Sequence, residues 1–169
     1  TFPVQKPQTK GAAPAAPTPA NTAESLGWQL RGALPPMRLH SVSLCGATGD
    51  VLWLSEGALG PDEHGFIMEA IDTLGADPSL AYCESDLEDG RGAVFLAVRA
   101  PTGDLVGVVM ILADIKSLSG GAASRILIAP IRAVLQRMAI LLRPANSATQ
   151  TVPVLGMGRS PARLLHRSR

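Results

Sequence analysis

The chain has 169 residues, of which 46% are hydrophobic, and its 15 basic residues nearly balance 14 acidic ones, giving a formal net charge of +1. A surface this close to neutral does not attract polyanions over its whole area, so we do not expect nucleic acid as a partner. The apolar runs are too short or too interrupted by charge to span a bilayer, and two cysteines cannot build a secreted disulfide framework, so we expect a cytoplasmic protein without membrane contact.

Both ends of the chain have the composition of linkers. Residues 1–21 are mostly Pro, Ala, Thr, Gln and Lys, and residues 145–169 are rich in Ser, Thr, Gly, Pro and Arg. Such segments bury too little apolar surface to offset the entropy of ordering. The sequence therefore predicts a disordered leader over 1–21, one folded domain over 22–144, and a flexible basic tail over 145–169.

The domain begins with a pattern typical of a helix followed by a hairpin. Apolar residues recur at helical spacing over residues 22–34, and two prolines end this helix. Residues 37–45 and 51–55 have the alternation of two strands, and the glycine-containing turn 46–50 joins them.

A second helix and the rest of a sheet follow. Residues 62–74 are predicted to form an amphipathic helix, with Pro61 and two acids at its start, where the helix dipole favours negative charge. Residues 80–84 form a short strand, and an acidic turn leads into a hairpin of residues 93–99 and 105–113.

The strand over residues 105–113 is apolar on both sides, which places it in the middle of the sheet. Strict alternation assigns its residues to two faces. One face carries Val106, Val108, Met110 and Leu112, and the other carries Leu105, Gly107, Val109 and Ile111.

The last helix, over residues 129–142, carries a heptad-like apolar seam that starts just before it. This seam is either part of the domain core or a dimer interface, and we weigh the two equally. We predict a homodimer through the terminal helices. The seam residues are Leu127, Ile131, Val134, Met138 and Leu141.

Together these patterns predict an α+β fold of the GAF/PAS type, with a central, mostly antiparallel sheet of five or six strands and flanking helices. The run from Val51 to His64 (Val-Leu-Trp-Leu-Ser-Glu-Gly-Ala-Leu-Gly-Pro-Asp-Glu-His) resembles GAF-like sensory domains found ahead of EAL-type cyclic-di-GMP phosphodiesterase domains. Asp89-Gly90-Arg91, Val98-Arg99, Gly103 to Gly107 and Leu141 to Pro144 resemble the same family, so the match covers residues 34–144.

The resemblance implies a regulatory module in bacterial cyclic-di-GMP signalling, with an EAL-type output domain as a partner. The chain itself contains no Glu-Ala-Leu signature and no carboxylate set for two metals, so we do not expect it to be an enzyme. We predict a non-catalytic sensory domain that binds a small ligand or a partner and signals through its terminal helices. The alternatives are a dimerisation or protein-interaction adaptor without ligand, and a GAF-fold thiol reductase acting on free methionine sulfoxide.

A ligand site is predicted where aromatic and cationic side chains share a pocket between sheet and helix. For each residue a structural role is the competing interpretation: Trp53 as core, His64 as a surface residue, and Arg91 as the partner of Asp86 or Asp89. The predicted ligand-binding residues are Trp53, His64, Tyr82, Arg91 and Arg99.

The remaining reactive groups favour no catalytic or metal site. The acidic residues fall in a helix start and a turn, where dipole pairing and solvation explain them, and His64 has no cysteine or histidine partner in its motif. Cys45 and Cys83 have apolar neighbours, which favours inert packing over redox chemistry and leaves the reductase as the minor alternative. No metal and no catalytic residue is predicted, and no cofactor is assigned.

Overall fold

The computed structural model describes residues 19–143, with side chains from residue 22 onward. Residues 1–18 of the predicted leader over 1–21 and the predicted tail over 145–169 lie outside these residues. The elements in chain order are α1 (Pro19–Ala33), β1 (Leu39–Gly46), β2 (Val51–Leu54), α2 (Pro61–Ala76), β3 (Tyr82–Asp86), β4 (Arg91–Arg99), β5 (Leu105–Asp114), the 3-10 turn η1 (Ile115–Leu118), α3 (Ala122–Ile126) and α4 (Ala129–Leu142).

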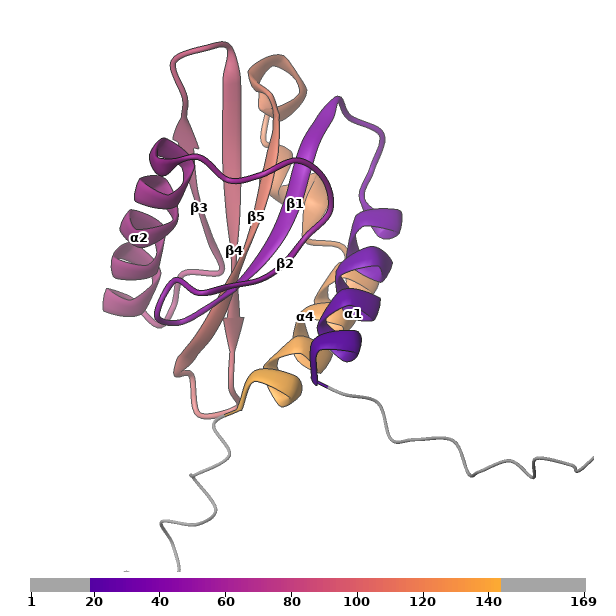
Figure 1. The fold of residues 1–169 in the computed structure, drawn as a ribbon, viewed down its shortest axis with the longest axis vertical. Coiled ribbons are helices and arrows are strands. Elements are labelled where there is room, and N and C mark those ends of the chain that lie inside the picture. Colours follow the sequence, from indigo (N-terminus) through magenta and orange to yellow (C-terminus); the bar gives the residue numbers. More distant parts are fainter. Residues whose placement is uncertain (1–18, 144–169) are drawn as a thin grey trace, which may run out of the picture.

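The five strands form one sheet in the order β2-β1-β5-β4-β3, and every neighbouring pair is antiparallel. Figure 1 shows α2 on one side of this sheet and α1 with α4 on the other. The predicted α+β class, the antiparallel sheet and both hairpins are therefore confirmed.

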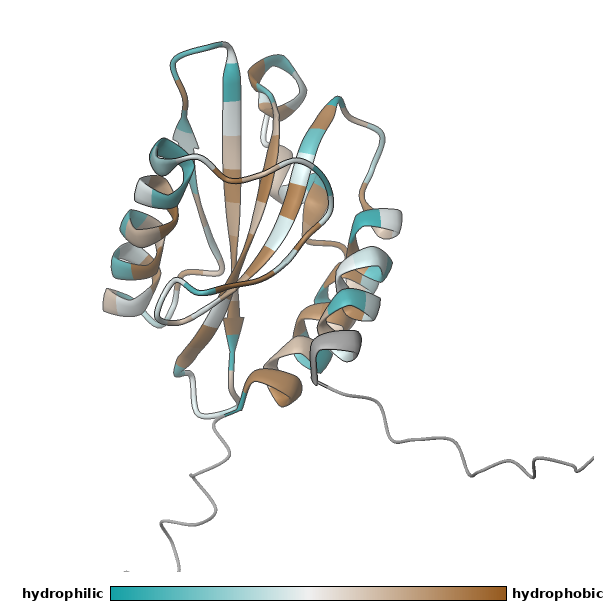
Figure 2. Cartoon of the chain, in the orientation of Figure 1, coloured by the Kyte–Doolittle hydropathy of each residue, from teal (hydrophilic) through white to brown (hydrophobic). Residues whose placement is uncertain are grey.

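Each face of the sheet has its own hydrophobic core. The core on the α1 and α4 side includes Leu30, Leu44 and Ile131, and the core on the α2 side includes Ile67 and Phe95, all fully buried. In Figure 2 hydrophobic colours follow the strands and the sides of α1 and α2 that face them, while hydrophilic colours lie on the outer sides. This three-layer arrangement requires a central strand that is apolar on both faces.

β5 is that central strand, as predicted, because β1 and β4 pair with its two edges. The predicted assignment of faces is wrong at its start: Leu105 packs with the core under α2, and Val106 with the core under α1 and α4. The register between β4 and β5 skips Val106, which marks a bulge. A bulge reverses the alternation of side chains locally, and no residue pattern in the sequence signalled it.

Several boundaries differ from the predicted ones by a few residues. α1 begins at Pro19 rather than at residue 22, and α2 runs through Gly75 to Ala76. β3 begins at Tyr82 rather than at residue 80, because the Leu80 N–H donates to the carbonyl of Asp77 (3.1 Å) and closes a turn there. Such local hydrogen bonds replace ladder pairing at the end of a strand.

Two short elements before α4 were not predicted, namely η1 and α3. Leu127 and Ile128 are the cap residues between α3 and α4, so Leu127 does not belong to the last helix. Pro130 lies in the first turn of α4 and has no N–H to donate to the preceding turn, which separates the two helices.

The close approach of β5 to β1 provides a test of the central packing. A Cβ added at Gly107 would lie 2.7 Å from the Cys45 carbonyl oxygen and 2.6 Å from Leu142 Cδ1. We expect Gly107→Ala to lower the free energy of unfolding by about 1 to 3 kcal/mol, because the strand backbone cannot give way easily. Urea unfolding measures this.

Gly32→Ala is the matched control, because a Cβ at Gly32 in α1 would meet nothing within 4 Å. Alanine has the higher helix propensity, so this variant should be as stable as the parent or more so, by up to about 1 kcal/mol. Equal stability of Gly107→Ala and the parent would contradict the described packing.

Candidate functional site

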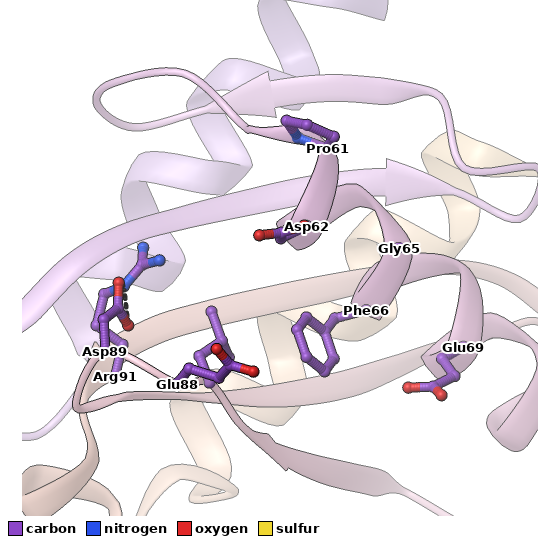
Figure 3. A pocket seen from close by; sticks show the side chains of 9 residues that line it. Pro61, Asp62, Gly65, Phe66, Glu69, Glu88, Asp89 and Arg91 are labelled. Atoms are coloured by element: carbon purple, nitrogen blue, oxygen red, sulfur yellow. Dashed lines mark hydrogen bonds and ion pairs between the residues drawn. The ribbon is translucent and has the colours of Figure 1, made fainter.

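An open groove of about 630 Å³ lies between the first half of α2 and the turn that joins β3 to β4. Figure 3 shows side chains from both segments lining it. We call this the α2–turn groove. Its lining residues are Pro61, Asp62, Gly65, Phe66, Glu69, Leu87, Glu88, Asp89 and Arg91.

The start of α2 positions one wall of the groove. Gly60 is the N-cap, Pro61 occupies the first turn, and the Glu63 side chain accepts a hydrogen bond from the Gly60 N–H (2.7 Å). Helical spacing then places Asp62, Phe66 and Glu69 along one side of the helix, facing the turn. The wall is therefore fixed by the helix start rather than by a loop.

Arg91 connects the two walls. Its Nη2 lies 3.0 Å from Glu63 Oε2, and its Nε donates to Asp89 Oδ2 at 2.8 Å. The hydrogen bond with Asp89 raises the pKa of Arg91 and lowers that of Asp89. Burial acts to raise the pKa of Glu63, but the hydrogen bonds from Gly60 and Arg91 together outweigh it, so this pKa lies below its ordinary value.

The groove carries an excess of negative charge beyond this network. Within residues 22–143 the carboxylates of Asp62, Glu69 and Glu88 have no hydrogen bond or ion pair. The floor between these carboxylates is apolar, formed by Phe66 and by Leu87, which is 8% exposed. An acidic rim around an apolar floor suits a basic, partly apolar partner.

The structure does not bring the five predicted ligand residues together. Arg91 lies in the α2–turn groove, whereas Tyr82 lines a separate hollow beside η1 and Arg99 lines a third one beside α4. His64 approaches the Gly49 carbonyl oxygen through Nε2 at 3.3 Å. Trp53, 9% exposed, packs in the core under α1.

Two of these residues have evident structural roles. The Trp53 ring meets Trp28 edge to face at 5.3 Å and lies where a side chain at Gly27 would otherwise be. Arg99 donates to the carbonyls of Leu74, Asp77, Leu80 and Gly103, and so holds the end of α2 against β4. The ligand-binding role assigned to the five residues remains a prediction.

The seam predicted for pairing faces the interior of the protomer. Ile131, Val134 and Met138 are at most 4% exposed and belong to the core beneath α1 and α4, while Leu127 and Leu141 are partly buried against it. A second subunit cannot reach the three buried residues in this fold. Of the two interpretations of the seam, the one as domain core therefore fits these residues. The outward side of α4 carries Arg132, Gln136, Arg137 and Ile140, which the heptad argument did not select.

Sequence reasoning also missed Phe66, Glu69 and Leu87 as groove residues. The available signals were the helical spacing of residues 62, 66 and 69 and the acidic turn that follows β3, but nothing in the sequence showed that the two segments meet. Within residues 22–143 no three His, Cys, Asp or Glu side chains are grouped so as to hold a metal ion, and no helix there is long and apolar enough to cross a membrane.

Comparison with known proteins supports the fold and nothing finer. No protein-family model and no curated protein matches the sequence. Two solved structures resemble the chain: "MglB with tetrameric arrangement" (TM-score 0.50, 9% identity, covering 76% of this chain and 93% of the other) and the gliding protein MglB from Thermus thermophilus (TM-score 0.48, 11% identity, with the same coverage).

The α+β architecture therefore resembles that of MglB. The comparison does not support the assignment to GAF-like domains of the EAL-associated kind. Many α+β domains share an antiparallel sheet with flanking helices. Short motifs in the strands of such a sheet therefore indicate the architecture more reliably than they indicate the family.

The pKa of Glu63 predicts a pH-dependent contribution to stability. Because the pKa of Glu63 is lowered in the folded state, its carboxylate stabilises the fold at pH values above its ordinary pKa of 4.5. This stabilisation is lost as the pH falls through the pKa of the folded state. Glu63→Gln should therefore lower the free energy of unfolding at pH 7 by about 1 kcal/mol, with a smaller difference below about pH 4.5. Urea unfolding across this pH range measures both.

An Arg91→Met background is the control for this measurement. Without the guanidinium, Glu63→Gln should cost less at pH 7, because one of the groups that stabilise the carboxylate is gone. A loss that is the same at pH 3 and pH 7 would contradict the assigned charge state.

The two thiols should be unreactive in the folded protein. Burial raises the pKa of Cys45 to about 11, and burial together with nearby Glu69 and Glu84 raises the pKa of Cys83. Thiolates are the reactive form, so we expect both cysteines to react with an aromatic disulfide reagent at pH 7 more slowly than free cysteine. Equal rates for the native and urea-unfolded protein would contradict this.

Proposed function

We propose that this chain is a non-catalytic regulatory adaptor that works by binding protein chains, beginning with copies of itself. The support comes from how the interior is filled and from what the surface leaves open. This corresponds to the alternative predicted from sequence, an adaptor without a small ligand, rather than to a ligand sensor.

The packing beneath α2 carries the proposal. A small-molecule sensor of the predicted kind requires an enclosed, polar-lined cavity between α2 and the sheet. In this chain Ile67, Leu74, Phe95 and Met110 occupy that position, and each is at most 1% exposed. Side chains fill the space where the ligand was expected, and the hollow beside it opens to solvent.

The described surface offers features that suit protein contacts. Trp28 is 46% exposed, and its ring is held by Trp53 at its edge and by the Arg31 guanidinium over its face (5.8 Å). Ile140 is 64% exposed on the outer side of α4. Ordered aromatic side chains and exposed aliphatic ones are typical anchors of protein interfaces.

The competing functions have weaker support. A role in cyclic-di-GMP signalling with an EAL-type output domain rests on short sequence runs alone, and the fold match does not extend to such domains. The thiol reductase requires a cysteine with a lowered pKa, whereas both thiols have raised values. One of the two matched structures is of MglB in a tetrameric arrangement, and for this chain self-association is part of the proposal.

Native mass spectrometry of the full chain at micromolar concentration tests the proposal. The expected spectrum shows an assembly of two or more subunits whose mass equals a whole number of polypeptides. Analytical ultracentrifugation over a hundredfold concentration range provides the association constant. A protein that stays monomeric at about 100 μM, or one that retains a stoichiometric small molecule, would contradict the adaptor function.

A further inference from the structure

The charges of this chain are divided between the two sides of the sheet. Ten of the 14 acidic residues lie between positions 61 and 104, where two arginines accompany them. From position 105 to 143 there is one acidic residue, Asp114, against one lysine and four arginines. The first stretch includes α2 and the β3–β4 turn, and the second includes α4, so these oppositely charged segments cover opposite faces (Figure 1).

The outer side of α4 is basic with an apolar centre. Ile140 is the most exposed large hydrophobic residue of the described chain, at 64%. Arg137 lies three residues before Ile140, on a neighbouring position of the same helix surface. Arg143 is the C-cap residue that follows the helix, and both arginines are exposed. None of the residues of α4 is acidic.

The α2–turn groove has the complementary arrangement. Its floor is apolar at Phe66 and Leu87. Its rim carries Asp62 and Glu69 on the helix and Glu88 on the turn (Figure 3). The three carboxylates have no partner within residues 22–143. An apolar centre between charges of one sign therefore occurs on both surfaces, with the sign reversed.

Gly65 provides a separate indication that a partner approaches this wall. It lies inside α2, where glycine costs about 1 kcal/mol relative to alanine. A Cβ at this position would meet nothing within 4 Å, so packing within the protomer does not require glycine. A glycine on the groove wall leaves room for the backbone or side chains of another chain.

We propose that α4 of a second copy docks into the α2–turn groove. Ile140 of that copy covers the floor at Phe66 and Leu87, and its Arg137 and Arg143 pair with the carboxylates of Asp62, Glu69 and Glu88. This interaction rests on the proposed adaptor function, since it specifies which surfaces of the chain associate. The occupant is a second copy because both complementary surfaces belong to the same sequence.

The two surfaces differ and lie on opposite sides of the sheet, so the contact is head to tail. Each subunit can then use its groove for one neighbour and its α4 for another, which generates a closed ring or an open chain rather than a two-fold pair. Such a contact is also sensitive to salt, because several of its charges are exposed.

Two substitutions at exposed positions test the two surfaces of the interface separately, one on α4 and one in the groove. Ile140→Glu removes the apolar anchor and adds a charge that the acidic groove repels, and Glu69→Arg reverses the charge of one rim. Each should raise the dissociation constant by about tenfold or more, as measured by sedimentation velocity. Asp72→Arg, at an exposed position of α2 outside the groove, is the control that should retain parental association and circular dichroism.

Mixing the two variants is the decisive experiment. The Ile140→Glu protein keeps an intact groove and the Glu69→Arg protein keeps an intact α4, so an equimolar mixture should form a 1:1 heterodimer although each variant alone is impaired. Association of the parent should also weaken between about 50 and about 500 mM NaCl, because added salt screens the exposed charges.

The outcomes separate this inference from the proposed function. A parent protein that is monomeric overturns both. A parent that assembles while both variants assemble equally well overturns the head-to-tail contact and leaves the adaptor function standing. Two impaired but folded variants that fail to complement each other also overturn it, because a two-fold interface would be lost from both partners.

Discussion

The structure depends on the burial of β5 on both of its faces. Val109 and Ile111 point into the core shared with α1 and α4, and Val108, Met110 and Leu112 into the core beneath α2. Because neither face of the central strand can be exposed to water without losing several buried side chains, helices are required on both sides of the sheet. The positions of α2 and α4 on opposite faces follow from this requirement.

The same requirement explains what the sequence could predict. The apolar run from residue 105 to 113 identified the central strand. The turns at residues 46–50 and 100–104 identified the β1–β2 and β4–β5 hairpins, because these signals lie within short stretches. The bulge at Val106 was not predictable, since it depends on how β4 and β5 are registered against each other. The resemblance to GAF-like domains is not supported by the fold comparison for a related reason: the motifs that suggested it fall in strands and turns that many α+β folds share.

The candidate site was harder to predict than the fold. Arg91 was predicted either to bind a ligand or to pair with Asp86 or Asp89, and the structure shows the pair with Asp89. The ion pair with Glu63 on α2, which joins the two walls of the groove, was not predicted. The apolar seam of α4 was recognised, but helical spacing alone does not tell whether a seam faces its own sheet or a neighbouring subunit. Ile131 and Met138 face the sheet, and the residues that face outward had no periodic signal of their own.

The two arginines that hold α2 bear on how this molecule could convey a signal. Arg91 fastens the first turn of the helix to the β3–β4 hairpin, and Arg99 grips the carbonyls at its far end. Sliding or tilting α2 would break both attachments and leave the two guanidinium groups without these hydrogen-bond acceptors. Under the proposed adaptor function, information is encoded in which chains are bound at a given moment rather than in deformation of the subunit. Little ordering entropy is lost when a rigid helix of this kind meets a neighbouring chain.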